Sequence, residues 1–202
     1  MTSKSHPAPI TLATKVTIVR ILGIPVFILM LIYYMMSLRA GESVDGYRYM
    51  ALALFVVIAV TDALDGFLAR WRDEETRLGA ILDPLADKAL LLSAIILLTQ
   101  PSLTDLSPQF PVSFTLLIIS RDAGLLIGSC LVHWVTGHVD VHPRLTSKAS
   151  TFFQMAAIIA ALIPLPEPVF FWLVGAAAFF TLVSGLQYIG DGARQLERPP
   201  PK

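Results

Sequence analysis

Four aspartates stand in two closely spaced pairs within an apolar part of the sequence. Asp62 and Asp65 are three residues apart, and Asp83 and Asp87 are four residues apart. On a helix, both spacings place the two side chains of a pair on one face. If the segment between the pairs turns the chain back, the two helices are antiparallel and the four carboxylates converge.

Converging carboxylates repel one another strongly near neutral pH unless cations bind between them. All-oxygen ligands select a hard ion such as Mg²⁺, Mn²⁺ or Ca²⁺. A metal pair held by carboxylates suits the polarisation of phosphoryl oxygens in a displacement reaction. The spacing of the aspartates therefore predicts a metal-dependent phosphoryl-transfer site.

Small and basic residues accompany the four aspartates. Gly66, Ala69 and Gly79 leave room for a ligand or a second helix to approach the backbone closely. Arg70 supplies positive charge where a nucleotide or phosphate can dock. Small residues in a membrane helix usually serve packing, so the value of these positions lies in their combination with the acids.

The composition indicates a protein that sits in lipid. Hydrophobic residues make up 55% of the 202 residues and charged residues only 15%, whereas a soluble domain carries about 25% charged residues. The 15 basic and 15 acidic residues balance, so the composition gives no indication of nucleic-acid binding. Cys130 is the only cysteine, which excludes an intrachain disulfide and a cysteine-rich metal site.

Six mainly apolar stretches are candidates for membrane helices, which need about 20 residues each. They are Val16–Leu38, Tyr49–Arg70, Ala80–Leu98, Val112–Val135, Ser150–Ile163 and Pro168–Ile189. The sequence therefore predicts an all-α integral membrane protein with six transmembrane helices. A single domain is expected over residues 1–202, with flexible tails at 1–9 and 191–202.

The distribution of lysine and arginine predicts the orientation of these spans. With six spans, the termini share a side with the second and fourth connecting loops. That side carries ten basic residues, which are Lys4, Lys15, Arg70, Arg72, Arg77, Arg144, Lys148, Arg194, Arg198 and Lys202. The opposite side carries two, Arg39 and Arg48. Both termini and the aspartates are therefore expected on the cytoplasmic side.

Ionisable residues inside the spans each cost about 2.5–3.5 kcal/mol on an insertion scale. Ion pairing between helices is the competing interpretation for Arg121 and Asp122, but it does not account for four aspartates around one cytoplasmic turn. A small ion or proton transporter is a remote alternative, and it would need carboxylates at successive depths of the bilayer. A non-catalytic, lipid-binding membrane module is a further alternative.

The stretch from Asp62 to Asp87 matches the signature D-x2-D-G-x2-A-R-x8-G-x3-D-x3-D at all eight fixed positions and every spacing. The chain therefore resembles the CDP-alcohol phosphatidyltransferases. This resemblance implies a six-helix membrane core and an enzyme that transfers a phosphatidyl group from CDP-diacylglycerol to an alcohol with release of CMP. Such enzymes are often homodimers, and a homodimer is expected here.

The resemblance also implies roles for the residues of the signature. Asp62, Asp65, Asp83 and Asp87 would hold two divalent ions, Mg²⁺ or Mn²⁺, and Asp87 would be the general base for the acceptor hydroxyl. The pocket for the CDP moiety would be formed by Asp62, Asp65, Gly66, Ala69, Arg70 and Gly79.

The acceptor alcohol is not defined by the signature. Two later segments, 119–122 and 147–154, resemble the glycerol-type branch of the family, which comprises phosphatidylglycerophosphate synthases and eukaryotic-type cardiolipin synthases. Asp122, Ser147 and Ser150 depart from the usual Ser-Arg-Glu and Gly-Lys-x-Lys-Thr patterns of the former. The Ser-Arg-Asp and Ser-Lys patterns, together with residues 82–88, are closer to the latter. Glycerol 3-phosphate is nevertheless the expected acceptor, in a bacterial inner membrane, and phosphatidylglycerol is the alternative.

An anionic acceptor requires cations. Arg121 and Lys148, together with Arg20 and Arg144, are the candidate acceptor-binding residues. For Lys148 and Arg144 the competing interpretation is ordinary positive-inside anchoring, and for Arg121 it is pairing with a neighbouring acid.

Overall fold

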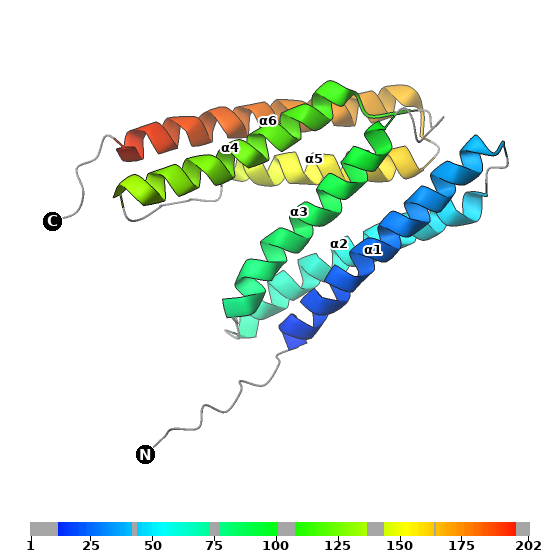
Figure 1. Cartoon of the computed structure of the whole chain (residues 1–202), viewed down its shortest axis with the longest axis horizontal. Helices are drawn as coiled ribbons and strands as arrows, with labels where there is room; N and C mark the ends of the chain where they lie inside the picture. The colour runs from blue at the N-terminus through cyan, green and yellow to red at the C-terminus, as the bar shows by residue number, and fades with distance from the viewer. Residues whose placement is uncertain are drawn as a thin grey trace, which may run out of the picture. The chain divides into compact units, whose positions relative to one another are not determined.

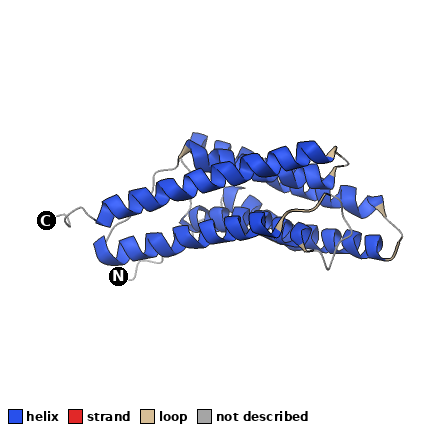
Figure 2. Ribbon diagram, turned by 90° about the horizontal axis from the view of Figure 1, so that it is seen from above, coloured by secondary structure: helices blue, strands red, loops and turns tan. Residues whose placement is uncertain are grey.

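The computed structural model of the chain describes residues 12–41, 44–72, 77–100, 108–136, 144–163 and 165–196. Apart from a few residues at the helix ends, this part of the chain is helical (Figure 2). The helices are α1 (Leu12–Arg39), α2 (Asp45–Arg72), α3 (Arg77–Thr99), α4 (Val112–Thr136), α5 (Leu145–Leu162) and α6 (Glu167–Leu196). The predicted all-α fold is confirmed.

Each predicted span lies within one helix or overlaps it, but two helix ends differ from the prediction. Helix α5 begins at Leu145 instead of Ser150, and α6 continues to Leu196 instead of ending at Ile189. The predicted tail from residue 191 is therefore wrong for residues 191–196. Hydropathy marks the part of a helix at membrane depth, whereas backbone hydrogen bonding continues into polar residues beyond it. Residues 1–9 and 197–202 lie outside the described residues.

Four helices within the described residues are long and apolar enough to cross a membrane. These stretches are Arg20–Arg39, Val112–Val135, Leu145–Leu162 and Glu167–Gln195. Large apolar side chains are exposed on them, including Leu22, Trp134 and Trp172. Soluble proteins rarely expose large contiguous apolar patches, so this surface is consistent with an integral membrane protein. Helices α2 and α3 carry the four aspartates.

The chain divides into two compact units, residues 1–93 and 94–202. In the first unit, α1 and α2 lie side by side (Figure 1). Gly41 adopts a positive φ of 76° at the end of α1, where a residue without a Cβ turns the chain at no steric cost. Within this helix pair, a Cβ added at Gly23 would lie 3.1 Å from Ile58 Cδ1, so glycine permits the close approach of α2. The rings of Phe27 and Phe55 pack between the helices.

In the second unit, α6 packs against both α5 and α4 (Figure 1). Helices α5 and α6 are antiparallel, since contacts of Ser150, Thr146 and Arg144 fall progressively farther along α6. Small buried residues on both helices, such as Ala157, Ala161 and Ala177, allow close packing. Phe153 stacks on Phe180 with ring centroids 5.4 Å apart. The prediction of a single domain over residues 1–202 stays a prediction.

Candidate active site

The aspartate pairs occupy consecutive turns of two helices. Positions 62 and 65 lie in α2, and positions 83 and 87 lie in α3, with residues 73–76 between the two helices. The backbone therefore has the helical conformation that the spacing argument required. The side chains of Asp62, Asp65 and Asp83 lie outside the described residues. Their convergence on a metal stays a prediction.

The predicted CDP pocket also stays a prediction, because the side chains of its residues are not described. Gly66, Ala69 and Arg70 lie on the last two turns of α2, and Gly79 lies on the first turn of α3. Their surroundings are outside the described residues. Because these positions follow Asp65 and precede Asp83 on the same helices, the backbone brings them to the same ends of α2 and α3 as the acids.

Asp87 is the aspartate of the predicted quartet whose side chain is described. Its Oδ1 lies 3.5 Å from Nη1 of Arg20, and the side chains of Arg20 and Asp87 are 2% and 37% exposed, respectively. A cation as deeply buried as Arg20 requires a compensating negative charge, which Asp87 supplies from α3. Arg20, a candidate for acceptor binding, is thus paired with a residue of the predicted metal site.

The carboxylates of the four signature aspartates are suitable ligands for a hard divalent ion. Four carboxylates supply only oxygen ligands, which Mg²⁺ and Mn²⁺ prefer, and the side chain of Asp87 is 37% exposed. Among the residues whose side chains are described, no group of three or more His, Cys, Asp or Glu could hold a metal. This result does not test the quartet, because three of its members lie outside that set.

Arg121 lies at the junction of three helices in the second unit. Its Nη1 donates to Asp122 Oδ1 at 2.7 Å, and its Nη2 donates to the hydroxyls of Ser147 on α5 and Ser184 on α6, each at 2.7 Å. The guanidinium also lies over the ring of Tyr188 at 5.7 Å, an arrangement that favours a cation. The pairing with Asp122 agrees with the competing interpretation of Arg121.

The other two acceptor candidates lie at the start of α5, Arg144 as its N-cap residue and Lys148 in its first turn. Arg144 makes a bidentate ion pair with Asp191 of α6, with Nε to Oδ2 at 2.9 Å and Nη2 to Oδ1 at 2.6 Å. Lys148 is exposed. Among the described residues, three of the four candidate cations therefore have an acid partner, and the fourth, Lys148, has an exposed side chain.

Several polar residues of α6 were missed by the sequence reasoning. Thr181, Ser184, Gln187 and Asp191 recur every three or four residues, and each makes a side-chain hydrogen bond with a residue of α4, of α5 or of the N-cap of α5. A polar stripe of helical period in an apolar helix is the signal that identifies them. The high mean hydropathy of α6 as a whole does not reveal this stripe.

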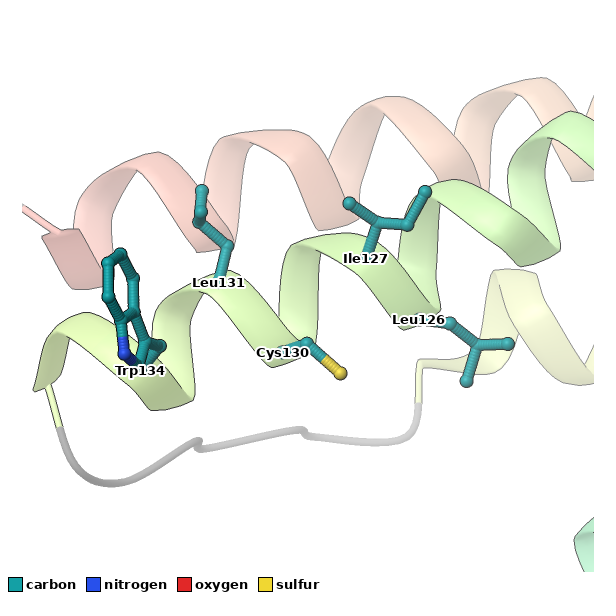
Figure 3. Close-up of a pocket in the computed structure, with 5 residues that line it drawn as sticks. All are labelled: Leu126, Ile127, Cys130, Leu131 and Trp134. Atoms are coloured by element: carbon teal, nitrogen blue, oxygen red, sulfur yellow. The ribbon is translucent and has the colours of Figure 1, made fainter.

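An apolar pocket on the surface of α4 carries no carboxylate or basic side chain. It is lined by Leu126, Ile127, Cys130, Leu131 and Trp134 (Figure 3). Gly124 and Gly128 on the same helix form a G-x-x-x-G pair, a spacing that lets a second helix approach closely. No described side chain lies within 4 Å of the place that a Cβ would take at either glycine. The predicted homodimer stays a prediction.

Comparison with known proteins identifies one protein family over most of the chain. The model of the CDP-alcohol phosphatidyltransferase family matches residues 10–183. The CDP-diacylglycerol–glycerol-3-phosphate 3-phosphatidyltransferase of Bacillus subtilis is 37% identical over 195 residues, which cover 92% of this chain and 97% of that protein. A probable phosphatidylglycerophosphate synthase of Mycobacterium tuberculosis is 33% identical, with 92% and 83% covered. The CMP-forming cardiolipin synthase of Rattus norvegicus is 32% identical, with 73% and 54% covered.

Proposed function

The chain belongs to the CDP-alcohol phosphatidyltransferase family, and we propose that it transfers a phosphatidyl group from CDP-diacylglycerol to glycerol 3-phosphate. The chain is an enzyme of phospholipid synthesis of this type. The observation that carries the choice of acceptor is the similarity over nearly the full length of both chains to a relative named for glycerol 3-phosphate. The protein would lie in a bacterial inner membrane, with its active site on the cytoplasmic side.

The donor half of the reaction is assigned to the signature residues. Asp62, Asp65, Asp83 and Asp87 would hold two divalent ions, Mg²⁺ or Mn²⁺. When bound, these ions neutralise the negative charge that develops on the phosphoryl oxygens and on the leaving CMP. Gly66, Ala69, Arg70 and Gly79 would line the pocket for the CDP moiety, with Arg70 paired to its phosphate.

Asp87 would accept the proton of the acceptor hydroxyl. As that proton leaves, the acceptor oxygen forms a bond to the phosphorus that carries the diacylglycerol, and the bond from this phosphorus to the oxygen of CMP breaks. The catalysis consists of positioning and charge stabilisation rather than a covalent enzyme intermediate. The ion pair of Asp87 with Arg20 holds the carboxylate on one side.

The acceptor half is assigned to the first turn of α5. The phosphate of glycerol 3-phosphate would contact the ammonium of Lys148, which is exposed. The N-terminus of a helix adds unpaired N–H groups and a partial positive charge. Arg121, whose charge is paired with Asp122, would support this turn through its hydrogen bond to Ser147.

Phosphatidylglycerol is a second candidate acceptor. Phosphatidylglycerophosphate synthases usually carry a second lysine where this chain has Ser150. Here Ser150 is 1% exposed and bonds Thr181 and Gln154. This position therefore presents no cation to a free phosphate monoester. The similarity to a cardiolipin synthase supports the same alternative.

One assay tests the proposed function. Purified protein is incubated with CDP-diacylglycerol, Mg²⁺ and either glycerol 3-phosphate or phosphatidylglycerol, and the lipid product is identified by mass. We expect CMP and phosphatidylglycerophosphate. Cardiolipin from phosphatidylglycerol would instead assign the second candidate, and no CMP with a panel of acceptor alcohols would contradict the transferase reaction.

The Lys148→Gln variant tests the acceptor site. Loss of one charge-assisted contact to phosphate is expected to raise the KM for glycerol 3-phosphate about tenfold. The kcat and the KM for CDP-diacylglycerol should stay near those of the wild type. Arg194→Gln, which removes an exposed cation near the end of α6, is the matched control. An unchanged acceptor KM would leave Lys148 with only the anchoring role.

A further inference from the structure

A polar ladder connects α5 to α6. Its rungs join residues whose positions descend along α5 as they ascend along α6, as expected for antiparallel helices. From the buried end outward, the rungs are Ser150–Thr181, Ser147–Ser184 through Arg121, Thr146–Gln187 and Arg144–Asp191. The ladder therefore fixes both the register of the two helices and the place of the first turn of α5.

The inner rungs are buried. The hydroxyls of Ser150 and Thr181 lie 2.7 Å apart, and Gln154 Nε2 donates to both at 3.0 and 3.2 Å. Thr181 also donates to the carbonyl of Ala177 on its own helix. Hydrogen bonds between buried polar groups are costly to break, because water does not reach these groups to form replacement hydrogen bonds. These rungs hold the helix pair together.

The outer rungs lie at the end of α5 that carries Lys148. Thr146 Oγ1 donates to Gln187 Oε1 at 2.7 Å, and the Arg144–Asp191 pair lies one turn farther along α6. Arg144 is the N-cap residue of α5, and its side chain makes no capping bond. Leu145 in the same turn is 83% exposed. Polar contacts to α6 and α4, and not apolar burial, therefore hold this turn.

We infer that Asp191 and Gln187 are positioning residues for acceptor binding. By holding Arg144 and Thr146, they keep the first turn of α5 in the place from which Lys148 meets the anionic group of the acceptor. This inference rests on the proposed function, since it assigns the acceptor to that turn. Part-exposed ion pairs contribute little to global stability, so the effect of the outer rungs is local order.

The Asp191→Asn variant tests this inference. Loss of the ion pair is expected to raise the KM for glycerol 3-phosphate about fivefold. The kcat and the KM for CDP-diacylglycerol should change less than about twofold. Hydrogen exchange of residues 144–149 should become faster, while exchange in the inner part of α5 should not change. Arg144→Gln should behave alike, and the double variant should add nothing further.

Two further variants separate positioning from damage to the fold. The double variant Asp191→Arg with Arg144→Asp, which exchanges the two charges, should bring the KM for glycerol 3-phosphate back close to the wild-type value. Gln187→Ala, which leaves no charge unpaired, should show the same selective rise as Asp191→Asn.

The possible failures are distinguishable. If the wild type transfers no phosphatidyl group to glycerol 3-phosphate or phosphatidylglycerol, the proposed function is wrong. The rate of hydrogen exchange at residues 144–149 in the variants still tests whether the outer rungs hold the first turn of α5. If the wild type is active and the Asp191→Asn and Gln187→Ala variants keep its acceptor KM, the inference is overturned. Equal rises in the KM for both substrates would also overturn it.

Discussion

The Asp87→Asn variant is expected to lose about 100- to 10,000-fold in kcat, the range of a lost general base, while CDP-diacylglycerol still binds. The amide has nearly the size of the carboxylate but cannot take the proton from the acceptor hydroxyl. Release of CMP measured at saturating acceptor, together with equilibrium binding of CDP-diacylglycerol, checks both parts. A kcat within about tenfold of the wild type would eliminate Asp87 as the base.

The ion pair with Arg20 requires a control for this result. Asp87→Asn also removes the negative charge beside a guanidinium that is 2% exposed, and loss of such a partner can destabilise a fold by itself. The double variant Asp87→Asn with Arg20→Gln removes both charges. Thermal stability should recover in the double variant, whereas kcat should stay low. Recovery of kcat would mean that the single variant failed through Arg20 and not through the proton transfer.

The fold could be predicted from local patterns, and the donor half of the site, which stays a prediction, rests on the same kind of pattern. Each helix contains a long apolar run, and the eight fixed positions from Asp62 to Asp87 follow one another within 26 residues along two helices. Such patterns depend on the period of the helix and on short sequence separations. The family match over residues 10–183 confirms the predicted family.

The acceptor half was predicted less completely, because its contacts join distant parts of the sequence. Arg121 and Ser184 are 63 positions apart, and Arg144 and Asp191 are 47 apart. Spacing cannot reveal which acid pairs with which cation when both lie on separate helices. Asp191 was therefore assigned to a tail, although it is the partner of a residue named for acceptor binding.

Removal of divalent metal is expected to abolish the release of CMP, with a loss of more than about 100-fold. Family members depend on divalent metal in general, and the four signature aspartates offer the ligands. Treatment with a chelator, followed by addition of Mg²⁺ or Mn²⁺, should remove and then restore the activity. Asp83→Asn should weaken metal activation, whereas Asp45→Asn, which changes an exposed acid at the other end of α2, should not. Full activity after complete removal of metal would contradict the proposed site.

A measurement without substrate distinguishes two origins of this dependence. If the aspartates bind the ions by themselves, Mg²⁺ binds the folded protein alone and raises its melting temperature. At a free concentration of 100 times Kd the stabilisation is about 2.7 kcal/mol, and relief of the repulsion among the carboxylates has the same sign. The Asp83→Asn variant should show a smaller rise and Asp45→Asn the full rise. If metal is needed for activity but leaves the melting temperature unchanged, the ions arrive with the nucleotide, because its phosphate oxygens then complete a coordination sphere that the carboxylates alone do not close.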